Sequence, residues 1–343
     1  MKALVLKEYR RLVVEDVPVP AIGASDVLVA VKACGICGSD VHGMDGSTGR
    51  RRPPVIMGHE ASGVIARIGD AVDGWKVGDR VTFDSTIWCG HCEFCRRGQV
   101  NLCNNRRVFG VSCEEYRQQG AFAEFVAVPQ RLLYRLPEGL PFEHAALVEP
   151  FSIAVHATRR VTLNRDDRCV VVGAGMIGLA LIQALRVAGC ERIIAVDVVS
   201  ERLALAETLG ATTLLNPATT DVLKDILRWT NGSGADVAFE AVGVASTVDL
   251  AVQSVRKGGS VTLVGNAAPQ VHLPLQRVVT RELTLLGSCA CSGEYPICLE
   301  MMSRGAIRPE KLLSACAPLS EGPSWFARLY RKEPGLLKVV LIP

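Results

Sequence analysis

The sequence predicts a mixed α/β protein in two parts, a β-rich segment followed by a doubly wound parallel sheet. Short β-branched runs separated by Gly, Pro and Asp fill the first 150 residues, whereas strand and helix patterns alternate after Pro150. The length of 343 residues is that of about two domains of roughly 150 residues each. Apolar residues make up 49% of the chain and charged residues 21%, which excludes a disordered or fibrous protein.

The elements follow from these patterns in chain order. In the first part, alternating or β-branched runs predict strands at residues 3–6, 27–32, 63–68, 80–83 and 123–128. In the second part, we expect strands at residues 169–172, 192–197, 236–240, 260–264 and 283–287. Helices are expected between them at residues 176–188, 201–209 and near 221–229. A final β-branched run at residues 336–342 ends the chain.

Charge and cysteine usage narrow the class of protein. Basic minus acidic residues is 38 − 35 = +3, which gives no electrostatic case for nucleic acid or an acidic membrane surface. No apolar run reaches the roughly 18 residues of a membrane span, and the first apolar run is too short for a signal peptide. The thirteen cysteines are an odd number, which argues against a disulfide framework. We therefore expect a soluble cytoplasmic protein in which clustered cysteines bind metal.

Four cysteines have the spacing of one closed metal site. Cys89, Cys92, Cys95 and Cys103 follow the pattern C-x2-C-x2-C-x7-C. Four thiolates complete the tetrahedral coordination of zinc and leave no position for substrate, so this site is predicted to be structural. The alternatives are an iron–sulfur cluster, which also uses four cysteines, or thiols that are grouped by chance.

A second set of residues predicts an open metal site. Cys37 lies in the segment Cys-Gly-Ile-Cys-Gly-Ser-Asp-Val-His of residues 34–42, and G-H-E-x2-G-x5-G runs from Gly58 to Gly69. This signature resembles that of the zinc-containing medium-chain dehydrogenases, in particular the polyol branch with sorbitol, galactitol-phosphate and threonine dehydrogenases. The resemblance extends over essentially the whole chain, up to the terminal run that begins at Lys338.

The resemblance implies both a domain plan and a catalytic zinc site. It implies a GroES-like, zinc-binding catalytic domain at residues 1–152, a Rossmann NAD-binding domain at 153–289 and a return to the catalytic domain at 290–343. Cys37 and His59 would bind the catalytic zinc, with Glu60 and Glu149 as carboxylates that can exchange as the third ligand. Three protein ligands and one open position would let zinc lower the pKa of an alcohol. The chain would thus hold two zinc ions, one catalytic and one structural.

Two further residues match a proton pathway in related alcohol dehydrogenases. Ser39, two residues after Cys37, corresponds to a hydroxyl that hydrogen-bonds the substrate oxygen, and His42 to a residue that passes the proton to solvent. The neighbouring Asp40 is expected to orient the loop backbone.

A dinucleotide fingerprint opens the second part of the chain. An apolar strand runs into G-x-G-x-x-G at Gly173, Gly175 and Gly178, and a helical pattern follows. The backbone amides of Met176 and Ile177 at the start of that helix would bind the pyrophosphate.

An acidic residue at the end of the next strand indicates which nucleotide binds. Asp197 lies nineteen residues after Gly178, where its carboxylate can accept hydrogen bonds from ribose hydroxyls and would repel a 2′-phosphate. NAD is therefore expected rather than NADP, although Arg202 is a cation that could approach a 2′-phosphate. Two pairs further along resemble the loops that hold the nicotinamide ribose and carboxamide, or are simply turn residues: Val242 with Gly243, and Val264 with Gly265.

The substrate is predicted only by class. The leading hypothesis is transfer of hydride between a secondary hydroxyl of a polyol or sugar-derived alcohol and NAD. Threonine or a vicinal diol is the alternative substrate, and a zinc-independent reductase or a non-enzymatic zinc-binding module is a more distant hypothesis. The run Arg50–Arg52 is either a solvated surface or an anchor for a phosphate or carboxylate. The strand near residues 283–286 resembles an edge that pairs between subunits, so a homodimer or homotetramer is expected.

Overall fold

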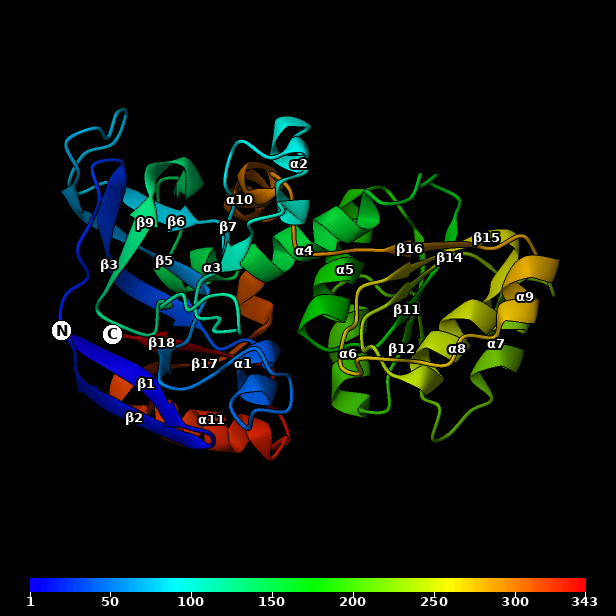
Figure 1. The fold of residues 1–343 in the computed structure, drawn as a ribbon. Coiled ribbons are helices and arrows are strands. Elements are labelled where there is room, and N and C mark those ends of the chain that lie inside the picture. The colour runs from blue at the N-terminus through cyan, green and yellow to red at the C-terminus, as the bar shows by residue number, and fades with distance from the viewer. The chain divides into compact units, whose positions relative to one another are not determined.

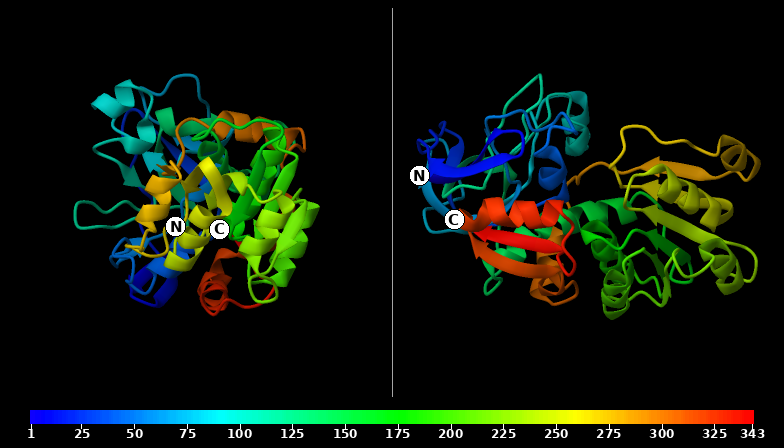
Figure 2. Two further views of the ribbon diagram at one scale, coloured as in Figure 1. Left: turned by 90° about the vertical axis from the view of Figure 1, so that its right-hand side faces the viewer. Right: turned by 90° about the horizontal axis from the view of Figure 1, so that it is seen from below.

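The chain forms two compact units, which a computed structural model describes over residues 1–343 (Figure 1). Unit 1 comprises Met1–Glu149 and Tyr295–Pro343, and unit 2 comprises Pro150–Glu294. The chain therefore passes between the units twice. The two termini lie near one another in unit 1 in every view (Figures 1 and 2). No helix has the length and apolar character needed to cross a membrane.

Unit 1 is built mainly of antiparallel strands. Its large sheet has the order β10-β6-β5-β3-β18-β17, with β9 paired to β3. The bounds of these strands are Leu133–Arg135 (β10), Arg80–Phe83 (β6), Glu60–Ile68 (β5), Asp26–Gly35 (β3), Lys338–Ile342 (β18), Leu313–Pro318 (β17) and Phe125–Pro129 (β9). A second sheet has the order β2-β1-β4, with bounds Arg11–Asp16, Lys2–Glu8 and Val55–Ile56, and β7 (Thr86–Ile87) pairs with β8 (Arg107–Val108).

The helices of unit 1 are short, and they surround a core of interlocking aromatic and aliphatic side chains. The helices are α1 (Gly38–Gly43), α2 (Glu93–Arg96), α3 (Phe142–Ala146), α10 (Tyr295–Ser303) and α11 (Gly322–Tyr330). Helix α4 (Val148–Thr158) begins at the end of the first segment of unit 1. In the core, Phe83 packs edge-on against Phe109 and Phe122 against Phe326, at ring-centre distances of 5.0 and 5.7 Å.

Unit 2 is a six-stranded sheet in which every neighbouring pair is parallel, in the order β13-β12-β11-β14-β15-β16. Its strands are β11 (Arg168–Val172), β12 (Arg192–Val196), β13 (Thr213–Leu215), β14 (Ala235–Glu240), β15 (Val255–Leu263) and β16 (Thr284–Gly287). The connecting helices are α5 (Met176–Val187), α6 (Ser200–Thr208), α7 (Val222–Trp229), α8 (Ala245–Ser254) and α9 (Leu275–Thr280). Helices α5 and α6 cover one face of the sheet and α7 and α8 the other (Figure 1). The predicted doubly wound fold is thus confirmed.

Several elements differ from the sequence expectation. Strands β2 and β13 and helices α8 and α9 were not predicted, and the structure places the strand expected at 123–128 at Phe125–Pro129. The chain leaves unit 1 after Glu149 and returns after Glu294, whereas the expected domains divide after residues 152 and 289. At the first of these points α4 continues without a break, and a helix that runs through a boundary leaves no loop signal in the sequence.

Candidate active site and nucleotide-binding loops

Cys37 is held at the turn between β3 and α1. It is the residue before the helix, and its Sγ accepts a hydrogen bond from the backbone N–H of Ser39 at 3.5 Å. Gly35, at the end of β3, is paired in register with Glu60 at the start of β5. A Cβ at Gly35 would collide with Glu60 Oε2, so the glycine makes room for that carboxylate. The pairing of β3 with β5 therefore brings Cys37 and Glu60 together.

Three of the predicted catalytic-zinc ligands form one cluster. Ligand atoms of Cys37, His59 and Glu60 all lie within 4.8 Å of one another. His59 and Glu60 are buried, and Cys37 is half-buried. One sulfur, one imidazole nitrogen and one carboxylate oxygen are ligands that zinc accepts, and three of them leave a fourth position open. The residues present therefore fit a catalytic zinc ion.

Lys338 forms a buried ion pair with Glu60. Its Nζ donates to Glu60 Oε1 and Oε2 at 2.8 and 2.7 Å and to the carbonyl of Ile36 at 2.9 Å. The side chains are only 2% and 1% exposed. Burial by itself would lower the pKa of Lys338, but the charges of Glu60, Cys37 and Glu149 and the hydrogen bonds to Glu60 together outweigh burial and raise the pKa. The sequence did not predict this contact, because Lys338 lies in the terminal run and no local spacing connects it to Glu60.

Asp40 faces the metal cluster rather than the loop backbone. Its carboxylate is fully buried, and Oδ2 lies 3.6 Å from His59 Nδ1. Contact with Nδ1 leaves Nε2 of His59 as the nitrogen available to a metal, an arrangement common among metal-binding histidines. The expectation that Asp40 orients loop backbone is therefore replaced by a contact with a predicted metal ligand.

The three consecutive arginines occupy different environments. Arg51 is buried and donates to Asp40 Oδ1, whereas Arg52 is exposed and forms an ion pair with Glu114. Arg50 is exposed, and its carbonyl accepts a hydrogen bond from the backbone N–H of Ser112. The run is thus neither uniformly solvated nor a single anion anchor.

Glu149 lies outside the three-residue cluster. It is buried in the first turn of α4, and its Oε1 accepts a hydrogen bond from Ser85 Oγ at 3.1 Å. Burial is the main cause that raises the pKa of Glu149 to about 8, with His59 opposing and Glu60 and Cys37 adding to the rise. His59, Glu60 and Cys37 thus all act electrostatically on the carboxyl group of Glu149, although this residue is not part of their cluster.

Ser39 and His42 both lie on α1 and are exposed. Ser39 Oγ accepts a hydrogen bond from Arg51 Nη2 at 3.3 Å. The backbone carbonyl of His42 accepts one from Ser47 Oγ at 3.0 Å. No hydrogen bond joins the two predicted relay side chains to each other.

The four cysteines of the predicted structural site converge on one point. The sulfur atoms of Cys89, Cys92, Cys95 and Cys103 all lie within 4.8 Å of one another. Backbone N–H groups point at these sulfurs, among them those of Cys92 to Cys89 and of Asn105 to Cys103, both at 3.4 Å. Hydrogen bonding, chiefly from the backbone of His91, lowers the pKa of Cys89 to about 5. A site with four converging thiols fits a closed structural zinc ion.

The glycine-rich turn of unit 2 has the geometry of a phosphate-binding loop. Gly173 has a positive φ of +96° at the end of β11, and Gly175 precedes α5, which begins at Met176. Met176 and Ile177 occupy the first turn of α5, where backbone amides have no partner in the helix. A Cβ at Gly178 would collide with the carbonyl of Gly173, whereas one at Gly175 would meet nothing within 4 Å. Gly175 is thus the glycine that leaves space beside the turn.

Asp197 follows β12 and stabilises this turn. Its Oδ2 accepts from the backbone N–H of Ala174 at 2.7 Å, and its Oδ1 accepts from that of Val199 at 2.9 Å. Arg202 lies half-buried on α6 and forms no ion pair with Asp197. Asp197 thus connects the glycine-rich turn to the segment that leads into α6.

Two more loops meet at the carboxyl ends of β14 and β15. Glu240 Oε1 accepts from the backbone N–H groups of Val242 and Gly243, and its carbonyl accepts from those of Val264 and Gly265. A Cβ on Gly265 would collide with the nitrogen of Gly243. The two glycines thus permit backbone-to-backbone contact, and their loops lie where ligands bind in doubly wound sheets.

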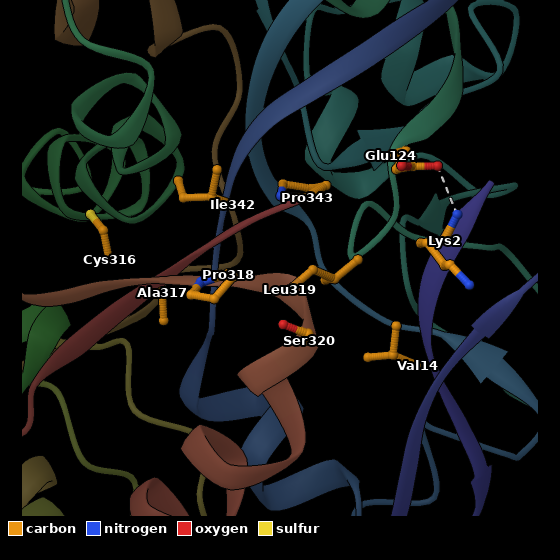
Figure 3. A pocket seen from close by; sticks show the side chains of 10 residues that line it. All are labelled: Lys2, Val14, Glu124, Cys316, Ala317, Pro318, Leu319, Ser320, Ile342 and Pro343. Carbon is orange, nitrogen blue, oxygen red and sulfur yellow. Dashed lines mark hydrogen bonds between the residues drawn. The ribbon is translucent and has the colours of Figure 1, made fainter.

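A separate pocket of about 670 Å³ lies in unit 1 beside the ends of β17 and β18 (Figure 3). Its lining includes Lys2, Glu124 and Cys316, and the backbone N–H of Lys2 donates to Glu124. None of the predicted site residues lines this pocket, so it is not the predicted metal site.

Comparison with known proteins identifies both parts of the chain. Residues 23–138 match the alcohol dehydrogenase GroES-like domain, and residues 177–304 match the zinc-binding dehydrogenase family. The chain is 33% identical to sorbitol dehydrogenase of Bacillus subtilis (strain 168), over 100% of this chain and 97% of that protein.

Two solved structures have the same fold. A zinc-binding dehydrogenase from Sinorhizobium meliloti 1021, bound to NADP, superposes with a TM-score of 0.91 at 33% identity, over 100% of this chain and 99% of the other. Galactitol-1-phosphate dehydrogenase from Escherichia coli gives a TM-score of 0.92 at 28% identity, over the full length of both chains. The sequence resemblance to this family and the predicted GroES-like and Rossmann folds are confirmed. The chain belongs to the zinc-containing medium-chain alcohol dehydrogenases, in their polyol dehydrogenase branch.

Proposed function

We propose that this zinc- and NAD(P)-dependent dehydrogenase transfers hydride between a secondary hydroxyl of a polyol or sugar-derived alcohol and NAD. The observation that carries the proposal is the cluster of Cys37, His59 and Glu60, which provides three ligands and an open position. The same chain has a glycine-rich turn suited to a dinucleotide.

Each residue of the metal site has a proposed role. Cys37, His59 and Glu60 hold the zinc ion, which when bound lowers the pKa of an alcohol by acting as a Lewis acid. Glu149, supported by Ser85, is the carboxylate that can replace Glu60 as the third ligand. Glu60 is favoured in this arrangement because its carboxylate oxygen lies within the cluster, whereas Glu149 lies outside it.

Ser39 and His42 provide the route for the substrate proton. The hydroxyl of Ser39 accepts the proton of the alcohol and passes it on, and the exposed imidazole of His42 releases it to solvent. The four-cysteine site keeps its structural role.

NAD is proposed as the preferred nucleotide. Gly173, Gly175 and Gly178 shape the pyrophosphate turn, with the amides of Met176 and Ile177 as donors. Asp197 would accept hydrogen bonds from the ribose hydroxyls and would repel a 2′-phosphate. Arg202 is a cation and would have the opposite effect on a 2′-phosphate. The nicotinamide ribose and carboxamide would be held by the two loops that contain Val242 with Gly243 and Val264 with Gly265. The similar S. meliloti dehydrogenase was solved with NADP bound, and comparison of NAD+ with NADP+ reduction tests the proposed preference.

The substrate class follows the relatives. Sorbitol and galactitol 1-phosphate, named for two similar proteins, both carry several hydroxyls. Burial of Arg51 against Asp40 removes this arginine as an anchor for a substrate phosphate. Threonine or a vicinal diol is the alternative substrate for the same site.

A cytoplasmic homodimer or homotetramer is also proposed. None of the thirteen cysteines belongs to a disulfide bond, as expected in a reducing compartment. Strand β16 is an edge of the unit 2 sheet, and the nearby α9 exposes Leu275 and Val279 by 64% and 65%. An unpaired edge with apolar side chains beside it supports pairing between subunits.

The experiment that tests the function combines substrate screening with zinc analysis. Wild-type protein should hold two zinc ions per chain and reduce NAD+ faster than NADP+ with at least one polyol among polyols, their phosphates, vicinal diols and threonine. The Cys37→Ser variant should lose one zinc ion and its activity, and Cys316→Ser, at an exposed cysteine, should lose neither. Reaction with threonine alone would select the alternative, and full activity of Cys37→Ser would refute the catalytic site.

A further inference from the structure

Arg51 is a buried arginine that the proposed reaction does not use directly. Its residue exposure is 3%, and its backbone forms a parallel bridge with Ser112. The side chain passes over Gly43 of α1, where an added Cβ would lie only 2.5 Å from Arg51 Cγ. The small residue at Gly43 of α1 and the bridge to Ser112 therefore allow the guanidinium of Arg51 to be buried.

The guanidinium fixes one particular oxygen of Asp40. Arg51 Nε and Nη2 both donate to Asp40 Oδ1, at 3.1 and 2.8 Å. This leaves Oδ2 of the fully buried carboxylate without a hydrogen bond, 3.6 Å from His59 Nδ1, which is also unpaired. Two unpaired buried polar atoms that face each other are arranged to form a hydrogen bond after a small adjustment.

The same guanidinium reaches the predicted proton relay. Arg51 Nη2 also donates to Ser39 Oγ at 3.3 Å. One side chain thus contacts the carboxylate that faces a metal ligand and the hydroxyl predicted to contact the substrate.

We infer that Arg51 is a positioning residue for the catalytic metal site. It orients Asp40 so that Oδ2 sets the ring of His59, and it holds the hydroxyl of Ser39 as an acceptor. The rigid guanidinium donates from two nitrogen atoms to Asp40 Oδ1 while Nη2 also reaches Ser39, and a lysine, with one nitrogen atom, does not reproduce this geometry. The inference relies on the proposed function for the identity of the metal.

Loss of Arg51 would disturb the site in a defined way. The buried carboxylate of Asp40 would lack its cationic partner and would turn toward another donor or take up a proton. Either change withdraws Oδ2 from His59. Since partners of metal-binding histidines commonly contribute a factor of 10–100 to metal affinity, the loss should be seen in zinc binding itself.

The test measures zinc affinity by chelator competition in the full chain. The Cys37→Ser protein identifies the signal of the structural site. Arg51→Met should weaken the other zinc ion by about 10–100-fold and leave the four-cysteine zinc in place. Arg51→Lys should give an intermediate loss, and Arg52→Met, at the exposed neighbour, should match wild type. Absorption of the cobalt-substituted protein should change in Arg51→Met, and kcat should fall more than KM rises.

The outcomes separate this inference from the proposed function. A loss of zinc affinity below about threefold in Arg51→Met overturns the inference. If Arg51→Met does not fold, the same threshold applies to Arg51→Lys. Wild-type protein that binds two zinc ions but oxidises no alcohol would refute the proposed function, and the affinity comparison would still decide on Arg51. A double variant, Arg51→Met with Asp40→Asn, should fold better than Arg51→Met and still bind zinc weakly, because it removes the unpaired charge without restoring the contact to His59.

Discussion

The ion pair of Lys338 and Glu60 places two opposite charges where almost no water reaches. Both side chains are at most 2% exposed. The breaking of such a pair by removal of one partner typically costs about 3–5 kcal/mol, since the remaining charge stays buried.

Lys338→Met should therefore destabilise the zinc-free protein by about 3–5 kcal/mol in urea unfolding. Bound zinc should reduce this loss if Glu60 is a ligand, because the metal then takes over the carboxylate charge. Lys7→Met is a matched control, since Lys7 pairs with Glu15 at the surface, and it should cost at most about 1 kcal/mol. Equal losses with and without zinc would contradict ligation by Glu60.

Two glycines of the nucleotide turn should respond differently to the same added methyl group. Gly175 has a φ of −76° and open space at its Cβ position, so Gly175→Ala should leave stability within about 1 kcal/mol of wild type. It should nevertheless weaken NADH binding by about tenfold or more, because the methyl group occupies the approach of the pyrophosphate. Gly178→Ala should instead destabilise the fold by about 1–3 kcal/mol through its collision with Gly173. Thermal unfolding and NADH titration measure both effects, and a stable Gly178→Ala protein would contradict the packing argument.

Local spacing predicted the residues that converge in the candidate site, and tertiary contacts determined the residues packed around them. Cys37, His59 and the four clustered cysteines belong to short motifs, so their convergence could be predicted from the sequence. Lys338 reaches Glu60 across 278 positions, and no spacing encodes that contact. Arg51 was visible as part of a charged run, but its burial depends on the small residue at Gly43 and on the bridge to Ser112.

At the scale of elements, one carboxylate connects three adjacent strands of unit 2. Asp236 on β14 accepts hydrogen bonds from Arg168 of β11, through both backbone N–H and Nε, and from Nε of Arg256 on β15. Burial opposes ionisation, but these donors outweigh it and lower the pKa of Asp236 below its ordinary value of 3.8.

Asp236→Asn should lower the free energy of unfolding by about 1–2 kcal/mol at neutral pH, a value reduced for partial exposure of the pair. Because the pKa is lower in the folded state, the ionised carboxylate stabilises the fold above pH 3.8, and this contribution disappears as the pH falls through the folded pKa. The difference between wild type and variant in urea unfolding should therefore shrink in acid. Asp225→Asn, in a surface pair with Arg228, serves as the control and should change stability little at any pH.

The elements with a strong period could be predicted, and those whose pattern merges with a neighbour could not. Strand β11 and helix α5 have a clear change from a buried run to a helical period. Helix α8 is followed at once by β15, so its buried positions, such as Val248 and Val252, run into a β-branched strand without a turn between them. Strand β13 has three residues and is defined only by its pairing with β12.

At the scale of the whole molecule, the two units should respond to different ligands. At a concentration of about 100 times its dissociation constant, NADH should stabilise the folded state by about 2.7 kcal/mol relative to the unfolded chain. We expect hydrogen exchange to slow in residues 150–294 on addition of NADH, chiefly around Gly173–Gly178 and Gly243. Removal of zinc should increase exchange in the other unit, around Cys37, His59 and the four-cysteine segment. Protection by NADH confined to residues 1–149 would contradict the assignment of the nucleotide site.

The placement of β18 has a consequence for the order in which the protein is made. This strand lies between β3 and β17 in the sheet of unit 1, yet the ribosome synthesises it after all of unit 2. Unit 2 is one continuous segment and can fold while the nascent chain is still growing. Unit 1 remains incomplete until residues 338–342 emerge, because Cys34 and Gly35 at the end of β3 lack their strand partner and Glu60 lacks its lysine. Assembly of the metal centre therefore follows the synthesis of unit 2, because Glu60 and Lys338 lie in segments of the chain that unit 2 separates.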